Sequence, residues 1–305
     1  MHSFEEQRIV DLIRGRGPCT GLEIQKELVL ASLPMWKTCR LSRELQVRPM
    51  GQRYLRLDRH VDGFARLSPS ILREFLTYSV IGLARDASLL EKRCRQVIGR
   101  IREISRYKFD LARGLVAEVM VEFQEEVADS PPLCFIIAGD IVYGMAHDVP
   151  RPEHSTGRLV RGSDIDLIVI VDDLFSDSQI ALLDGIIYRK KYRMLINPTL
   201  NEEIDYKVKR LSVAEKQADF DDFRHMVAIK ILHEGVLLHG SENLFQAVKT
   251  ILRERGLHEK LQVMTERAAL FRENAERELL AGHLGVEDIK KRHLFYSAEE
   301  HEEFA

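Results

Sequence analysis

Residues 162–173 read Gly-Ser-Asp-Ile-Asp-Leu-Ile-Val-Ile-Val-Asp-Asp, and this stretch decides how the rest of the chain is interpreted. Its apolar part, residues 167–171, is rich in β-branched side chains and of strand length, which predicts a strand buried on both faces. Because side chains alternate along a strand, Asp164 and Asp166 share one face. Two carboxylates at the mouth of a buried strand repel each other, and a divalent cation such as Mg²⁺ removes that repulsion. The stretch therefore predicts a strand that binds a metal ion.

Length and composition indicate a globular protein of two or three domains. The chain has 305 residues, of which 45% are hydrophobic and 30% charged, and its net charge of −3 means that any basic surface is local. Its four cysteines lie far apart without a Cys-x-x-Cys pair, which argues against a zinc site and a disulfide framework. The first residues lack a signal-peptide pattern and no run approaches ~18 apolar residues, so we expect a soluble, cytoplasmic protein with no membrane partner.

Residues 1–66 are predicted to form a winged helix-turn-helix domain. Three short helical patterns come first, the second with a capping box of Thr20 and Glu23, and residues 47–57 then read as a hairpin of two strands. This segment holds twelve Lys and Arg against eight Asp and Glu, opposite in sign to the whole chain. Four basic residues of the third helix and the wing are candidate nucleic-acid contacts: Lys37, Arg40, Arg43 and Arg53. Winged helices also bind proteins, so the expected partner of this domain is RNA, DNA or a protein.

Residues 67–130 are predicted to be a helical connector. Ser68 would cap its first helix with Pro69 at the first helical position, and apolar residues recur at helical spacing from there. Residues 84–113 are strongly basic, a pattern found in RNA-binding helices and more often in connectors with a solvated face. The run Asp-Ser-Pro-Pro at residues 129–132 marks the end of this segment.

Residues 131–212 are predicted to be an α/β core. A short buried strand at residues 133–138 leads into Gly139-Asp140 and a helix start, an arrangement that aims backbone N–H groups at phosphate. A loop at residues 147–161 precedes the paired aspartates, and a helix capped by Ser176 and a further strand at residues 193–196 follow. Residues 202–209 alternate polar and apolar, which predicts a half-buried strand with Asp205 on its polar face.

Residues 213–305 are predicted to be a helical C-terminal region. Helical patterns cover residues 213–234, 242–255 and 258–280, and residues 235–240 connect the first two. The tail, residues 297–305, is acidic and expected to fray.

The order of motifs in the core resembles the nucleotidyltransferase superfamily with the DNA polymerase β-like fold. Family members carry a glycine turn at a helix start, a Ser-Asp-x-Asp strand and a third carboxylate on a later strand. The matching residues are Gly139, then Ser163, Asp164 and Asp166, and then Asp205. Residues 231–240 also resemble the helix and turn that follow the third carboxylate in minimal nucleotidyltransferases. The resemblance implies an α+β fold, in which a small mixed sheet is flanked by helices.

For function, the resemblance implies transfer of a nucleoside monophosphate from a nucleoside triphosphate, with release of pyrophosphate. Asp164, Asp166 and Asp205 would hold two Mg²⁺ or Mn²⁺ ions, and Asp205 would also act on the acceptor hydroxyl. Gly139 and the following N–H groups would hold the β- and γ-phosphates, with Ser163 nearby. Further candidate phosphate contacts are Arg158, Arg161 and Lys207. The N-terminal module favours a macromolecular acceptor, RNA or protein.

Two departures from the family pattern leave alternatives open. Asp140 stands where the family has serine, so it turns away, joins the metal cluster or weakens triphosphate binding. The loop at residues 145–161 is also longer than the common spacing.

Two alternatives to nucleotide transfer onto a macromolecule remain. The acceptor is a small molecule such as an antibiotic, or the protein is a DNA-binding regulator whose nucleotidyltransferase domain only senses nucleotide.

Overall fold

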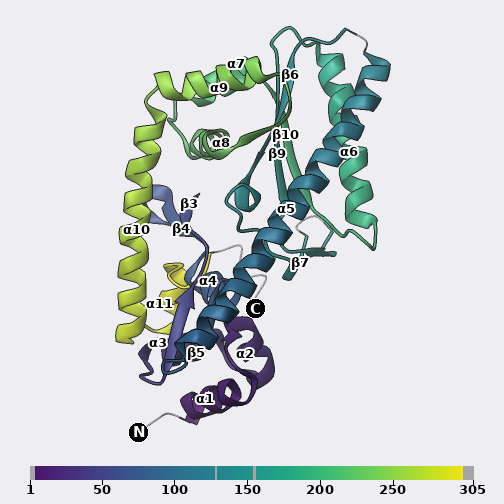
Figure 1. Cartoon of the computed structure of the whole chain (residues 1–305). Helices are drawn as coiled ribbons and strands as arrows, with labels where there is room; N and C mark the ends of the chain where they lie inside the picture. The colour runs from purple at the N-terminus through teal and green to yellow at the C-terminus, as the bar shows by residue number, and fades with distance from the viewer. Residues whose placement is uncertain (1–3, 128, 154–155, 298–305) are drawn as a thin grey trace. The chain divides into compact units, whose positions relative to one another are not determined.

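The computed structural model describes residues 4–127, 129–153 and 156–297, which form a mixed α+β protein (Figure 1). The chain divides into two compact units: Met1–Arg100 together with Val263–Ala305, and Ile101–Gln262. Two long helices, α5 (Ala87–Glu126) and α10 (Leu257–Ala281), contribute residues to both units. This division differs from the four consecutive segments predicted from the sequence, because the C-terminal part of the chain joins the N-terminal part.

The second unit is built on a four-stranded sheet in the order β10-β9-β6-β11. Its strands are β6 (Leu133–Ala138), β9 (Ile165–Val171), β10 (Ile204–Arg210) and β11 (Val236–Gly240). Strands β9 and β10 are parallel, whereas β6 pairs antiparallel with both β9 and β11. The sequence predicted β6, β9 and β10, but β11 was expected to be only a connection.

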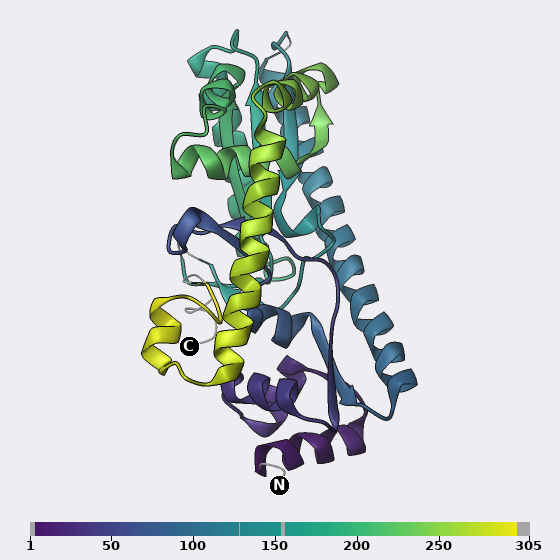
Figure 2. The same ribbon diagram turned by 90° about the vertical axis from the view of Figure 1, so that its left-hand side faces the viewer.

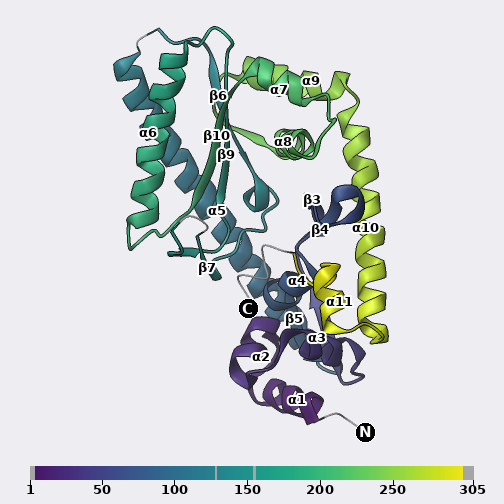
Figure 3. The ribbon, with the colours of Figure 1, turned by 180° about the vertical axis from the view of Figure 1, so that it is seen from behind.

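Helices cover both faces of this sheet. One face carries Phe135, Leu167 and Val169, which pack into a core with apolar residues of α5 and α6 (Asp177–Ile196). The opposite face is covered by α7 (Leu211–Gln217), α8 (Phe223–Glu234) and α9 (Glu242–Glu254), which contact β6, β9 and β10. Figures 1 and 3 show these two layers of helices from opposite sides of the unit. Both faces of β9 are therefore buried, as its continuous apolar sequence predicted.

Local predictions in the second unit had mixed outcomes. Ser176 caps α6 in a capping box with Gln179, as expected, but α6 continues to Ile196, so the strand predicted at residues 193–196 is wrong. The helix predicted after Gly139 is also wrong, because a 3₁₀ turn, η2 (Gly139–Ile141), stands there. The loop before the aspartates contains a two-stranded sheet of β7 (Pro150–Pro152) and β8 (Leu159–Arg161).

The first unit begins with three helices, as predicted: α1 (Phe4–Arg16), α2 (Gly21–Leu28) and α3 (Ser32–Leu41). The capping box of Thr20 and Glu23 at the start of α2 is confirmed. The hairpin predicted at residues 47–57 is wrong, because its two strands do not pair with each other. Strand β2 (Leu45–Pro49) pairs with β5 (Ser79–Leu83), and β3 (Tyr54–Leu57) pairs with β4 (Ala65–Ser68).

The segment predicted as a helical connector is also different from the expectation. Ser70, rather than Ser68, caps α4 (Ile71–Thr77), and β5 then forms the centre of a sheet in the order β1-β5-β2, where β1 is Cys19–Thr20. Val80 and Ile81 of β5 are completely buried. This β-branched run therefore gains more from two strand partners than from continuing a helix.

The C-terminal segment completes the core of the first unit. Leu279 of α10 and Phe295, which follows α11 (Val286–Lys291), are buried with residues of α1, α3 and α4. The ring of Phe295 lies 5.7 Å from that of Trp36, which is a core residue of this unit. Figure 2 shows the last helix, in yellow, folded back beside the end of α10. The acidic tail predicted to fray lies outside the described residues from residue 298 onward.

Within the described residues, no helix has the length and apolar character that crossing a membrane requires. The four cysteines, Cys19, Cys39, Cys94 and Cys134, are free and buried, as expected for thiols outside a disulfide framework.

Candidate metal centre

Three predicted carboxylates meet at one end of the second unit's sheet. Asp164 precedes β9, Asp166 is its second residue, and Asp205 is the second residue of the parallel strand β10. Asp205 is the register partner of Asp166, and paired residues of neighbouring strands point to the same face. One carboxylate oxygen from each of the three aspartates lies within 4.8 Å of the others. The structure thus brings together the three residues that the sequence predicted as metal ligands.

The electrostatics of this cluster favour a bound cation. Burial raises the pKa of Asp166 well above its usual range, and the neighbouring carboxylates of Asp164 and Asp140 raise it further. Burial likewise raises the pKa of Asp164, against the opposing effect of Arg151. Clustered carboxylate oxygens are the ligands that Mg²⁺ prefers, and a divalent ion would relieve their repulsion. The donor set therefore fits the ion that the resemblance implies.

The glycine turn lies directly against this cluster. Gly139 has a φ of +72°, and a Cβ at this position would collide with Oδ2 of Asp166. Only glycine meets both conditions without strain. Its N–H, which the sequence predicted to hold phosphate, donates a hydrogen bond of 3.2 Å to Oε1 of Glu234. That amide is therefore already engaged by a side chain at the end of α8.

Ser163 and Asp140 are hydrogen-bonded to each other. Oγ of Ser163 donates to Oδ2 of Asp140 at 2.7 Å and accepts from the N–H of His147 at 3.2 Å. The Asp140 carboxylate is thus held by Ser163, and it lies close enough to the three clustered aspartates to raise the pKa of both Asp164 and Asp166. The serine hydroxyl predicted to lie near phosphate here connects the glycine turn to the start of β9.

Arg151 is a residue of this site that the sequence did not reveal. Its side chain is 8% exposed, and its guanidinium forms an ion pair of 2.8 Å with Glu203 and lies 3.8 Å from Asp164. Its Nε also donates to the carbonyl of Gly162 at 2.8 Å. Arg151 thus connects the turns that precede both carboxylate strands. Nothing in the Pro-Arg-Pro sequence around it gives a periodic signal that would have indicated this role.

Two lysines also reach the site from helices. Nζ of Lys191, in α6, lies 3.3 Å from Oδ1 of Asp205. Lys108, in α5, forms a fully buried ion pair with Glu202 and donates to the carbonyl of Arg161 at 2.7 Å. The basic pattern of residues 84–113 predicted an RNA-binding or a solvated face, so the burial of Lys108 within it is a correction. Nothing in the sequence around Lys108, between Arg106 and Asp110, signals a partner as distant along the chain as Glu202.

The remaining predicted phosphate contacts are exposed. Arg161 ends β8, and Arg158 immediately precedes that strand. Lys207 lies on β10 two residues beyond Asp205, on the same strand face.

Some of the basic residues predicted to contact nucleic acid in the first unit have their charge neutralised by carboxylates. Arg53 forms two hydrogen bonds with the carboxylate of Glu74, at 2.6 and 2.8 Å, and these bonds raise its pKa further. Arg40 lies 3.6 Å from Glu276, so two of the four cations have carboxylate partners. Lys37 is half-buried and Arg43 is exposed.

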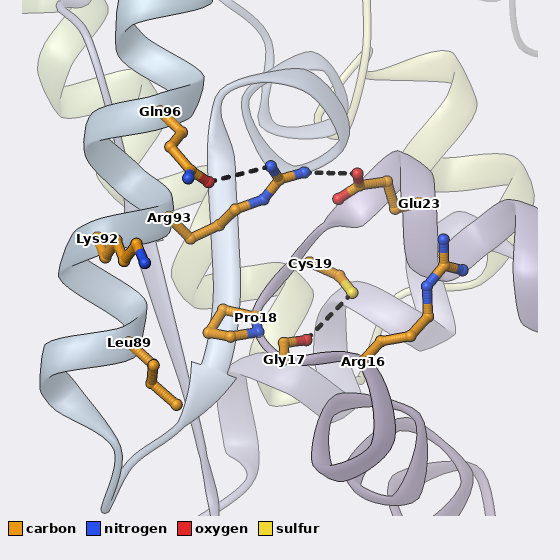
Figure 4. Close-up of a pocket in the computed structure, with 9 residues that line it drawn as sticks. All are labelled: Arg16, Gly17, Pro18, Cys19, Glu23, Leu89, Lys92, Arg93 and Gln96. Atoms are coloured by element: carbon orange, nitrogen blue, oxygen red, sulfur yellow. Dashed lines mark hydrogen bonds and ion pairs between the residues drawn. The ribbon is translucent and has the colours of Figure 1, made fainter.

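The first unit also contains a pocket of about 410 Å³, drawn in Figure 4. Arg93 crosses it to reach Glu23 at 2.6 Å and Gln96 at 3.4 Å. Arg16 at its rim pairs with Glu27 at 2.7 Å, and burial raises the pKa of the Cys19 thiol. Arg93 and Arg16 thus have carboxylate partners, and the thiol stays protonated. This pocket therefore has fewer groups ready to bind a ligand or to react than the carboxylate cluster has.

A second group of potential ligands, Asp221, Asp222 and His225, lies at the start of α8. Asp222 caps that helix through the N–H of His225, and Asp221 bonds the imidazole of His225 at 2.6 Å. Helix capping and the contact with His225 explain this group. No protein-family model matches the chain, and no curated protein matches it at a significant level. The geometry of the carboxylate cluster therefore carries the functional argument.

Proposed function

We propose that the second unit is a nucleotidyltransferase domain of the DNA polymerase β-like superfamily. It would transfer a nucleoside monophosphate from a nucleoside triphosphate to an acceptor hydroxyl and release pyrophosphate. The observation that carries the proposal is the meeting of Asp164, Asp166 and Asp205 within 4.8 Å on two parallel strands. The mixed sheet with helices on both faces gives this cluster the setting that the resemblance implies.

Each carboxylate has a role that follows from its position. Asp164 and Asp166, both half-buried beside the glycine turn, would hold divalent ions that neutralise the charge on the attacking and leaving oxygens. Asp205 has a side chain that is 54% exposed, so it faces the solvent from which an acceptor arrives. Asp205 would therefore take the proton of the acceptor hydroxyl, and Lys191 would hold its carboxylate in place.

The favoured acceptor is a macromolecule, RNA or protein, and where the first unit recruits it a protein is favoured over RNA. A DNA-binding regulator is less well supported, because Arg40 and Arg53 already have carboxylate partners within their own unit. These ion pairs reduce the positive charge that phosphate contact by the first unit would need.

The proposal is tested by incubating the full-length protein with each α-³²P-labelled nucleoside triphosphate and Mg²⁺, with and without total RNA. We expect label to reach RNA, protein or a small molecule, and the nature of the product identifies the acceptor. Asp166→Asn should lower transfer by roughly 100-fold or more, the scale for losing a group that stabilises charge in the transition state. Asp221→Asn is the matched control, since it removes an aspartate of the other acidic group in the same unit. Equal transfer by the wild type and Asp166→Asn would contradict the proposal.

A further inference from the structure

Glu234 holds both ends of the glycine turn. It is the last residue of α8, and its side chain is 4% exposed. Oε1 accepts the N–H of Gly139 at 3.2 Å, and Oε2 accepts the hydroxyl of Tyr143 at 2.6 Å. Lys230, one turn earlier in α8, balances the charge at 2.6 Å. A single buried carboxylate thus spans residues 139–143.

The end of α8 that carries Glu234 is itself fixed. Nζ of Lys249, in α9, donates to the carbonyls of Leu232, His233 and Gly235 at 2.7 to 2.8 Å. Gly235 packs so closely on β6 that a Cβ there would collide with Ile136. Because three hydrogen bonds and the close packing of Gly235 on the Ile136 side chain hold this helix end, Glu234 is anchored rather than poised to move away.

The turn is also fixed on its other side, where the metal cluster lies. Asp140 is bonded to Ser163 at 2.7 Å, and the α-carbon of Gly139 leaves no space for a side chain beside Oδ2 of Asp166. The position of the turn therefore determines where the Asp166 carboxylate can lie.

We propose that Glu234 is a positioning residue that clamps the glycine turn against Asp166 and so sets the metal-binding geometry of that carboxylate. This inference rests on the metal centre of the proposed function. It also changes the expectation for phosphate, because the Gly139 amide is used within the protein and the donor phosphates are held by other groups.

Mn²⁺ binding to the full-length protein, measured by electron paramagnetic resonance, tests the clamp without requiring catalysis. Glu234→Met keeps the side-chain length but accepts no hydrogen bond, and we expect it to weaken Mn²⁺ binding roughly tenfold, the usual scale for residues that orient metal ligands. Glu234→Gln keeps an oxygen that accepts the Gly139 N–H, so its affinity should stay within about threefold of wild type. Asp166→Asn supplies the baseline for a lost ligand, and Lys230→Met controls for loss of the ion pair alone.

Tyr143→Phe removes the hydrogen bond from the Tyr143 hydroxyl to Glu234 and should weaken Mn²⁺ binding by a smaller factor. This variant provides a second test if Glu234→Met does not fold. Unchanged Mn²⁺ affinity in folded Glu234→Met, or in Tyr143→Phe where the former is unfolded, would overturn the proposal. Tighter binding of a nucleoside triphosphate by Glu234→Met would also overturn it, since Glu234 would then be a competitor of phosphate. If the wild type binds Mn²⁺ with the expected variant pattern but transfers no nucleotide, the proposed function fails and the clamp stands.

Discussion

Asp205 lies directly beside Asp166 in the parallel register of β10 and β9, with Ala138 of β6 on the other side of Asp166. The hydrogen bonds of the sheet fix the backbones of these two residues side by side, so their side chains start from neighbouring positions on one face. The fold therefore holds unfavourable charge at the place where it is useful for binding a cation.

This relationship predicts that Asp166→Asn stabilises the metal-free protein at neutral pH. Burial raises the pKa of Asp166 above its ordinary 3.8, so the folded state loses stability as the pH rises from about 3.8 through the raised pKa. Asparagine removes this cost, and each kcal/mol gained should raise the Tm by roughly 2–4 °C. Thermal unfolding in EDTA over a range of pH measures the effect.

The gain from Asp166→Asn should disappear below about pH 4, where the aspartate is protonated in both states. Added Mn²⁺ should raise the Tm of the wild type more than that of the variant. A lower Tm for Asp166→Asn at neutral pH in EDTA would show that the carboxylate is not under electrostatic strain.

A pair of glycine variants separates backbone strain from the contact with Asp166. Gly139 and Gly144 both have positive φ angles, +72° and +64°, so alanine at either position should cost roughly 1–2 kcal/mol of stability. Only Gly139→Ala also pushes against Asp166, because a Cβ at Gly144 meets no atom within 4 Å. We expect Gly139→Ala alone to lose Mn²⁺ binding, measured by electron paramagnetic resonance beside urea unfolding. Similar Mn²⁺ affinities for the two variants would contradict the close contact.

We expect substitution of Arg151 to lower the free energy of unfolding strongly, and a second substitution to recover part of that loss. Arg151→Met leaves the Glu203 carboxylate, 3% exposed, without its cation, which typically costs about 3–5 kcal/mol. Arg151→Met with Glu203→Met removes both charges and should recover a large part of this loss. Urea unfolding of the two variants measures the difference. If the double variant is less stable than Arg151→Met by the full cost of a second independent substitution, the two residues are not coupled.

Local sequence signals predicted much of the fold. The capping residues Thr20 and Ser176 act through neighbours three positions away, and the continuous apolar run of β9 reflects burial on both faces. By contrast, β2 finds its partner β5 some thirty residues later, and no local pattern distinguishes that pairing from the predicted hairpin. The return of Phe295 to the N-terminal core is likewise a long-range contact.

The same distinction applies to the site. Asp164 and Asp166 were found because their spacing on a strand places them together. Alternation placed Asp205 on the polar face of its strand, and the family resemblance singled it out as the third carboxylate. Arg151, Lys191 and Glu234 reach the cluster from other elements, through contacts that only the folded chain creates. Sequence reasoning thus identified the three clustered carboxylates and missed the residues that contact their surroundings.

Anomalous diffraction from crystals grown with Mn²⁺ and a non-hydrolysable nucleoside triphosphate tests the central claim most directly. We predict Mn²⁺ ligated by Asp164 and Asp166, a second ion that includes Asp205 among its ligands, and the triphosphate bound to both ions. Mn²⁺ bound only at Asp221, Asp222 and His225, or a nucleotide bound away from Asp164, Asp166 and Asp205, would contradict the account.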